Sequence, residues 1–201
     1  MLDGAARKLI GPGLDRLGEG LARRGVTADR VTYLGFALGV AAAGAIAARL
    51  YLVGLVLILA SRLCDGLDGA VARATQKSDR GGFLDIVLDF AFYGMIPLGF
   101  VIAEPESNAV AGATLLFSFY VNGASFLAYA IMAEKRGLAT EARGEKSLYF
   151  TSGLAEATET ILVFVLFCVV PGHFAVIAYV FAALTLVTAA ARIFLAIKVF
   201  C

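Results

Sequence analysis

Six long apolar stretches constrain this chain more than any other feature of its sequence. A helix needs about 20 residues to cross a lipid bilayer, and these stretches together take up most of the 201 residues. Hydrophobic residues make up 60% of the chain and charged residues only 16%, whereas soluble domains carry roughly a quarter of charged residues. We therefore predict an all-α integral membrane protein with six transmembrane helices, over residues 29–49, 51–73, 82–102, 108–133, 150–170 and 174–197.

The first 25 residues differ from the rest of the chain. Apolar residues recur at helical spacing over residues 2–22, with charged residues between them, which predicts an amphipathic interfacial helix before the first span. Such a helix can lie at the membrane surface or pack on the transmembrane helices. Gly11-Pro12-Gly13 is expected to break it into two pieces. The chain thus divides into a juxtamembrane helix over 1–25 and a six-helix transmembrane domain over 26–201.

Lysine and arginine gather on one side of the predicted topology. They occur in the amino-terminal segment and in the loops after the second and fourth spans, whereas the other side has only Arg49. Because basic residues favour the cytoplasmic side of a membrane, both termini are expected in the cytoplasm. The net charge of +1 gives no indication of nucleic-acid binding.

Small and polar residues inside the spans predict contacts between helices. Gly35-x3-Gly39 fits a close approach of two helices, and Asn122 and Ser125 are expected to form hydrogen bonds between helices.

Four aspartates around the loop between the second and third spans carry the most specific signal. Residues three or four apart share one face of a helix. By this rule the aspartates fall into two rows on consecutive helices, which are Asp65, Asp68, Gly69 and Ala72, and then Gly81, Asp85 and Asp89. Antiparallel packing of these helices would turn all four carboxylates toward one pocket.

Such a group of acids is unfavourable without a cation. A single acid at the centre of a membrane helix costs about 2.5–3.5 kcal/mol, and mutual repulsion adds to this. Two divalent ions would remove both penalties, and carboxylate oxygens favour Mg²⁺ or Mn²⁺. A pair of such ions can stabilise a phosphoryl transfer. The alternative is that the acids pair with Arg62, Arg73 and Arg80 as buried salt bridges.

The two rows together resemble the signature of the CDP-alcohol phosphotransferase family, also called class I CDP-alcohol phosphatidyltransferases. The matching residues read Asp65-x2-Asp68-Gly69-x2-Ala72-Arg73-x7-Gly81-x3-Asp85-x3-Asp89. Many members have eight residues before the second glycine, and this chain has seven. The segment from Gly25 to Gly35 is similar, more weakly, to the one that opens the first span in the family. The chain looks most like bacterial inner-membrane members. Members of the family are usually homodimers with the site at the cytoplasmic face, and the resemblance implies the same here.

The resemblance implies roles for individual residues. Asp65, Asp68 and Asp85 would hold the metals, and Asp89 would hold the second metal and act as the base for the acceptor hydroxyl. The CDP moiety would be bound by Gly69, Ala72, Arg73 and Gly81, together with Asp29 and Thr32. The acceptor oxygen would attack the phosphorus distal to cytidine and release CMP. Residues 26–201 would thus form the catalytic domain.

Two sets of residues are candidates for binding the acceptor. The basic residues Arg136, Arg143 and Lys146 would suit a phosphorylated alcohol, unless they only reflect the cytoplasmic bias for positive charge. Glu156 and Glu159 would suit a neutral polyol, or they would serve helix capping and contacts between helices. An anionic acceptor is favoured, because the family often uses one.

The leading functional prediction is transfer of a phosphatidyl group from CDP-diacylglycerol to a polar alcohol in phospholipid biosynthesis. One alternative is transfer of a headgroup from a soluble CDP-alcohol to a lipid alcohol. A divalent metal transporter is another, although the outer halves of the spans offer almost no polar path. An assembly protein with an inactive site is disfavoured because every signature residue is present.

Overall fold

The computed structural model describes residues 3–137 and 157–200, and all regular secondary structure in them is helical. Side chains are described from residue 10 onward within these ranges. Seven α-helices and one short 3₁₀-helix occur in them: α1 (Asp3–Arg23), α2 (Ala28–Ala47), α3 (Tyr51–Ala74), α4 (Asp79–Ala103), α5 (Pro105–Lys135), α6 (Ala157–Val169), η1 (Pro171–His173) and α7 (Phe174–Phe200).

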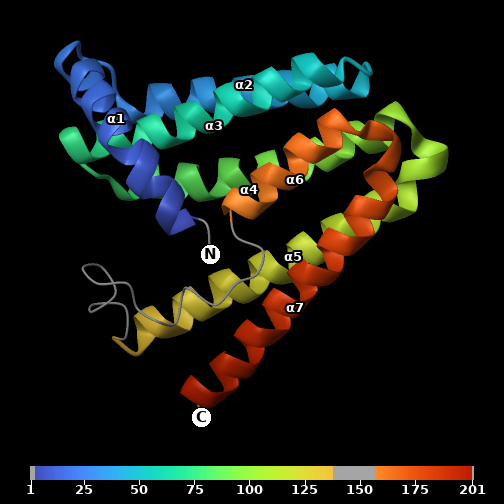
Figure 1. The fold of residues 1–201 in the computed structure, drawn as a ribbon. Coiled ribbons are helices and arrows are strands. Elements are labelled where there is room, and N and C mark those ends of the chain that lie inside the picture. Colours follow the sequence, from blue (N-terminus) through green and yellow to red (C-terminus); the bar gives the residue numbers. More distant parts are fainter. Residues whose placement is uncertain (1–2, 138–156, 201) are drawn as a thin grey trace.

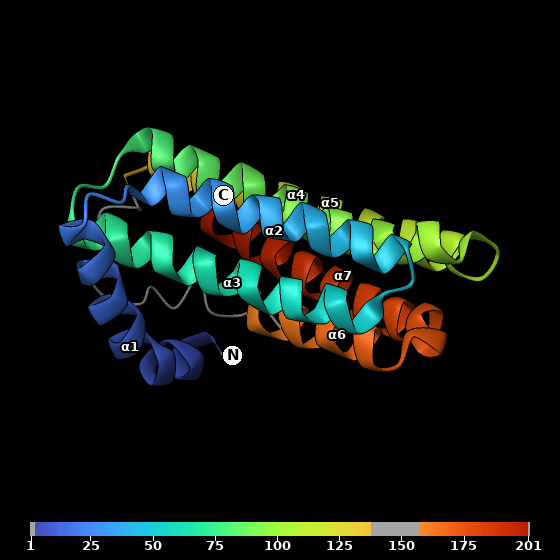
Figure 2. The same ribbon diagram turned by 90° about the horizontal axis from the view of Figure 1, so that it is seen from above.

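The helices pack as an elongated bundle with α1 across one end. Helices α2 and α3 run side by side, α5 packs along α7, and in Figure 1 α4 and α6 lie between these two pairs. Seen from above, the amino-terminal part of α1 projects away from the bundle (Figure 2), and its second half packs on α3 through Leu14 and Gly18. The turn from α3 to α4 lies at the same end of the bundle as α1, so this end holds the aspartate signature.

Aromatic packing holds the middle of the bundle together. Phe100 stacks on Phe174 with ring centroids 5.0 Å apart, and Phe167 lies 4.6 Å from Phe174. Phe92 and Phe164 continue the same buried cluster. Large apolar rings at this depth link α4, α6 and α7 through dispersion contacts.

The described helices agree closely with the predicted spans, whereas the amino-terminal helix differs from its prediction. Helix α1 continues through Pro12 as one helix, so the predicted break is wrong. Helix α4 likewise runs on through Pro97, which is buried. Neighbouring turns of a packed helix can tolerate the one missing hydrogen bond of proline. The first part of the predicted fifth span, residues 150–156, lies outside the described residues.

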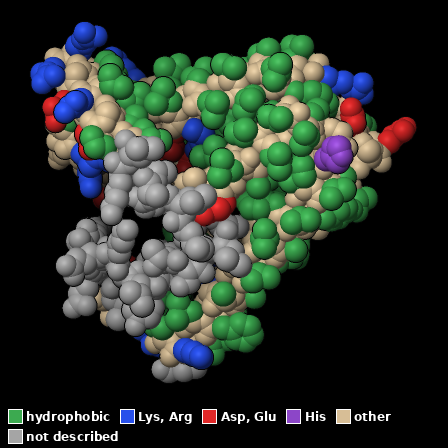
Figure 3. Space-filling view, in the orientation of Figure 1, with side chains coloured by type: hydrophobic (Ala, Val, Ile, Leu, Met, Phe, Trp, Pro, Cys, Tyr) green, Lys and Arg blue, Asp and Glu red, His purple; other side chains and the backbone are tan. Residues whose placement is uncertain are grey.

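In the described part of the chain, four helical segments are long and apolar enough to cross a membrane, judged by length and composition: Ala28–Ala47, Asp79–Ala103, Pro105–Lys135 and Pro171–Phe200. Helix α6 is apolar but has only 13 residues in the described part of the chain. Helix α3 has 24 residues but carries Arg62, Asp65 and Asp68. Hydrophobic side chains cover much of the face in Figure 3, with charges toward its ends. This is an integral membrane architecture, and the number of six spans stays a prediction.

Glycines allow α2 to approach both α3 and α4, as the Gly35-x3-Gly39 spacing predicted. A Cβ atom at Gly35 would lie 2.9 Å from the Cβ of Cys64, and one at Gly39 would lie 2.7 Å from the ring of Phe92. Ser61, which is fully buried, donates a hydrogen bond to the Gly35 carbonyl at 2.7 Å. Helix α2 is therefore fixed closely against the two helices that carry the acids.

Helix α1 is attached to α3 by a similar close approach. A Cβ atom at Gly18 would lie 2.6 Å from the Cβ of Ala70 and 2.8 Å from its backbone carbon. From the other side, a Cβ at Gly66 would lie 2.8 Å from a methyl group of Leu14. The predicted packing of this helix on the transmembrane helices is therefore confirmed. Its predicted place at the membrane surface stays a prediction.

We expect Gly18→Val to loosen α1 from α3, because its side chain would collide with the backbone of Ala70. Trypsin should then cleave at the arginines of α1 several-fold faster than in the parent protein in detergent. Gly20→Val is the matched control, since a Cβ atom at Gly20 would have no atom within 4 Å from any other described part of the structure. Equal cleavage rates in the two variants would contradict this account of the contact.

Candidate metal centre

The four signature aspartates come from two helices that make little backbone contact with each other. Asp65 and Asp68 lie on α3, and Asp85 and Asp89 lie on α4, while α2 packs against both helices. The expected direct packing of α3 on α4 is thus replaced by an arrangement in which α2 holds the two at a distance. The space between them is a pocket lined by all four aspartates, by Leu88 of α4, and by Thr32 and other residues of α2 and α3.

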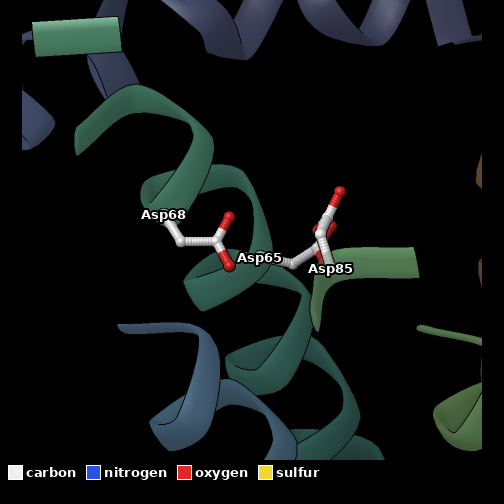
Figure 4. Close-up of side chains that lie close together, drawn as sticks. All are labelled: Asp65, Asp68 and Asp85. Atoms are coloured by element: carbon white, nitrogen blue, oxygen red, sulfur yellow. The ribbon is translucent and has the colours of Figure 1, made fainter. Parts of the chain in front are cut away.

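Three of the aspartates converge in this pocket. Asp65, Asp68 and Asp85 each offer a carboxylate oxygen, and these three oxygens lie within 4.8 Å of one another. Figure 4 shows Asp68 pointing from its own turn of α3 toward the other two. Asp68 is buried, with 7% of its surface exposed, whereas Asp85 is exposed. The oxygen-only donor set fits Mg²⁺ or Mn²⁺, which prefer carboxylates.

The fourth aspartate, Asp89, lies beside an arginine. Arg62 Nη1 donates to Asp89 Oδ1 at 2.6 Å and lies 3.5 Å from Asp65 Oδ1. Arg62 therefore does form salt bridges with the signature acids, which was the alternative to metal binding. This alternative does not hold for Arg73, which pairs with Asp15 of α1, or for Arg80, which lies 3.7 Å from Asp29.

Helix α2 supplies a hydrogen bond to the most buried acid. Thr32 Oγ1 donates to Asp68 Oδ2 at 2.6 Å, and the close contact at Gly35 sets this distance because Thr32 is one turn away on the same face. The predicted nucleotide-binding residue Thr32 is thus placed at the acids. Asp29 lies nearer to the start of α4, where its Oδ1 would be 3.7 Å from a Cβ at Gly81.

The remaining signature residues lie along the last turns of α3 and the first turn of α4. Among the described residues, a Cβ atom at Gly69 would come within 4 Å of Arg73 only, with Nη1 at 3.4 Å, so the described structure leaves this face of α3 open. Ala72 is half-buried in the same turn. The Gly81 backbone N–H donates to Ser78 Oγ at 3.0 Å, which caps α4.

Asp15 is a partner that the sequence alone did not indicate. Its Oδ1 lies 2.7 Å from Arg73 Nη2, and both side chains are 52% exposed. The pair spans 58 positions of the chain, so no local spacing could have pointed to it. An exposed pair of this kind contributes little stability, about 0–1 kcal/mol, but it orients the signature arginine.

Of the five predicted acceptor residues, two lie in the described part of the chain, Arg136 and Glu159. Arg136 lies at the end of α5 and donates to the carbonyls of Val199 and Phe200, so it caps α7. Glu159 is half-buried in the first turn of α6. The other three predicted acceptor residues, Arg143, Lys146 and Glu156, lie outside the described residues.

Arg192 is a half-buried arginine to which the sequence pattern gave no role. Arg192 Nη1 on α7 donates to Asn122 Oδ1 and to Ser125 Oγ, both at 2.8 Å. The prediction that Asn122 and Ser125 form hydrogen bonds between helices is therefore confirmed. Their partner lies about 70 positions away along the chain, which only the packing of α5 on α7 reveals.

The helical fold and the carboxylate pocket define a membrane protein with a candidate site for divalent ions. Residues 25–195 match the sequence model of the family described as CDP-alcohol phosphatidyltransferase. The chain belongs to this family and is a transferase of that class, as the aspartate signature predicted.

Individual relatives fit this assignment. Inner membrane protein YnjF of Escherichia coli (strain K12) is 47% identical over 193 residues, which cover 96% of this chain and 94% of the relative. An archaetidylinositol phosphate synthase of Pyrococcus horikoshii is 31% identical over 110 residues, covering 54% of this chain and 58% of that protein. The crystal structure of Mycobacterium tuberculosis phosphatidylinositol phosphate synthase (PgsA1) with CDP-DAG bound has the same fold, with a TM-score of 0.70, 23% identity and coverage of 91% and 92%.

We expect Thr32→Val to destabilise the protein in the presence of a chelator. Valine keeps the shape of threonine but removes the donor, and a buried acceptor left without its partner costs about 1–3 kcal/mol. Thermal unfolding in detergent with EDTA measures the change, and Thr32→Ser, which keeps the hydroxyl, is the control. Equal stability of the valine and serine variants would show that the bond to Asp68 contributes nothing.

Proposed function

We propose that this protein transfers a phosphatidyl group from CDP-diacylglycerol to a polar alcohol and releases CMP. The observation that carries the proposal is the convergence of Asp65, Asp68 and Asp85 from two helices within 4.8 Å, in a chain whose family acts on CDP-alcohols. The relatives named as synthases of archaetidylinositol phosphate and phosphatidylinositol phosphate support a lipid on the donor side.

The three converging acids would hold divalent metal, with Asp89 as a further ligand. Bound Mg²⁺ or Mn²⁺ would neutralise the acids and the negative charge of the diphosphate. Thr32 keeps Asp68 oriented toward the pocket through its 2.6 Å hydrogen bond. In this proposal α3 and α4 carry the metal ligands, and α2 holds them in position.

The last turn of α3 would bind the CDP moiety. Arg73 offers a forked guanidinium for phosphate, and the open face at Gly69 leaves room beside it. Ala72 and Gly81 keep the neighbouring surface small. Asp29, in the first turn of α2, lies near Gly81 and would accept hydrogen bonds from the nucleoside.

The reaction needs one proton transfer and one bond exchange. The acceptor hydroxyl oxygen bonds to the phosphorus that carries the diacylglycerol, and the bond from that phosphorus to the CMP oxygen breaks. The hydroxyl proton passes to the Asp89 carboxylate, which acts as general base. CMP leaves with the electron pair of the broken bond.

The acid-bearing end of the bundle would face the cytoplasm. Among the described lysines and arginines, Arg49 alone lies at the turn between α2 and α3, at the opposite end, and basic residues favour the cytoplasmic side. The six spans, the cytoplasmic termini in a bacterial inner membrane and the homodimer remain predictions of the sequence and belong to this proposal.

The acceptor would be a phosphorylated polyol. The similarity to archaetidylinositol phosphate synthases supports this class, as do Arg143 and Lys146 in the segment before α6. Arg136 is a weaker candidate than the sequence suggested, because its guanidinium donates to two carbonyls of α7. Glu156 and Glu159 would orient free hydroxyls of the same acceptor.

We expect Asp65→Asn, Asp68→Asn and Asp85→Asn each to abolish the release of CMP from CDP-diacylglycerol, and EDTA to do the same to the parent protein. An amide cannot replace a carboxylate as an anionic ligand. Asp79→Asn is the control, because Asp79 is exposed in the first turn of α4 and does not line the pocket.

Full activity in excess EDTA would end the metal-dependent proposal. Activity with soluble CDP-alcohols and diacylglycerol, but none with CDP-diacylglycerol, would move the lipid to the acceptor side. Metal flux into proteoliposomes without any CMP release would favour the transporter.

For the acceptor, we expect Arg143→Ala and Lys146→Ala to raise the KM for inositol phosphate while leaving the KM for CDP-diacylglycerol nearly unchanged. Glu156→Gln should have a smaller effect. Arg24→Ala, which removes an exposed charge in the turn after α1, is the control. Insensitivity at both basic positions, with a large loss at Glu156 and better turnover of neutral inositol, would assign a neutral polyol instead.

A further inference from the structure

Arg62 lies among the signature acids but is not itself one of the signature residues. Its side chain is 11% exposed. The guanidinium carbon lies 3.7 Å from the centre of the Phe92 ring, which is a cation–π contact. Its Nη2 donates to Ser61 Oγ at 3.3 Å, and its Nε is buried with no hydrogen-bond partner among the described residues. The cation is therefore held in place by groups on both α3 and α4.

The four acids form two overlapping groups, one of three converging carboxylates and one of two carboxylates beside Arg62. Asp65, Asp68 and Asp85 bring their oxygens together, whereas Asp89 Oδ1 is held by Arg62 at 2.6 Å. Asp65 belongs to both groups, because its Oδ1 lies 3.5 Å from the same guanidinium nitrogen. Arg62 and a divalent ion would thus both interact with the carboxylate of Asp65, so the two cations would lie close together.

We propose that Arg62 is a built-in counter-cation of this site, which positions Asp89 and weakens the binding of divalent metal. The inference rests on the proposed function, because it takes the acids to be metal ligands. Without metal, the guanidinium offsets the repulsion between Asp65 and Asp89. With metal present, like charges repel across a poorly screened space, and Arg62 cannot swing away easily because Phe92 and Ser61 hold it.

Two consequences follow for the chain's own residues. Asp89 keeps a fixed orientation on α4 through its bond to Arg62, so Arg62 is a positioning residue for the general base. Removal of the positive charge should leave Asp65 and Asp89 more available to metal, so affinity for metal should rise while Asp89 becomes less well oriented. A purely structural arginine would affect folding but not the affinity for metal.

The test is the dissociation constant for Mn²⁺, measured by electron paramagnetic resonance of the free ion with the full-length protein in detergent. We expect Arg62→Gln and Arg62→Met to bind Mn²⁺ about tenfold more tightly than the parent, a change of about 1.4 kcal/mol. Arg62→Lys keeps the charge and should stay close to the parent. Arg49→Gln is the matched control, since Arg49 lies at the other end of the bundle and donates to the Ala103 carbonyl.

An unchanged dissociation constant in Arg62→Gln and Arg62→Met would overturn the inference while leaving the metal site intact. A parent protein that binds no Mn²⁺, or whose binding survives Asp65→Asn, would overturn the proposed function together with it. If removal of the single charge prevents folding, Arg62→Gln is combined with Asp89→Asn and compared with Asp89→Asn alone. The double variant should bind Mn²⁺ more tightly, because Arg62 also acts on Asp65, and equal affinities would refute the proposal.

Discussion

Mutual repulsion among carboxylates at the end of a membrane bundle is the constraint to which the other contacts of the site respond. Taking acids out of water is unfavourable unless opposite charge or hydrogen-bond donors offset it. Thr32 supplies a donor to Asp68, and Arg62 supplies a cation to Asp89 and Asp65. These contacts leave Asp85 exposed, and they keep the acids close enough to share a cation.

The position of α2 makes this arrangement possible. Gly35 and Gly39 let its backbone approach α3 and the ring of Phe92 on α4, so the two acid-bearing helices are joined through a third. Phe92 then has two roles, since one part of its surface meets α2 and its ring face supports Arg62. Packing and electrostatics are thus linked through one aromatic side chain, and a site of this kind depends on close helix contact as much as on its ligands.

Local spacing predicted the part of the site that lies on single helices. The three- and four-residue intervals placed Asp65 with Asp68 and Asp85 with Asp89, and they also identified the family. Apolar length predicted the ends of the described helices to within a few residues, apart from the start of the fifth span, which lies outside the described residues. The pairings of Arg62 with Asp89, Arg73 with Asp15, and Arg192 with Asn122 join distant parts of the chain. A single sequence holds no spacing rule for such contacts, because they depend on which helices become neighbours.

Helix continuity through Pro12 shows a related limit of local rules. Gly11-Pro12-Gly13 is unfavourable for a helix taken alone, but α1 gains packing on α3 through Leu14 and Gly18 in the turns that follow. Tertiary contacts of this kind can outweigh a local preference of a few kcal/mol.

The position of the pocket near a helix end also suits a substrate that is half lipid and half nucleotide. The acids lie in the last turns of α3 and the first turns of α4, beside the amphipathic α1, rather than in the middle of the apolar bundle. Acyl chains need the apolar surface of the spans, whereas a diphosphate and an alcohol need water and opposite charge. A site at this depth offers both environments within one short distance, which a site in the centre of the bundle would not. The position of the charged residues and the proposed chemistry thus follow from the same requirement, an apolar surface for acyl chains directly beside a hydrated, charged site for the diphosphate.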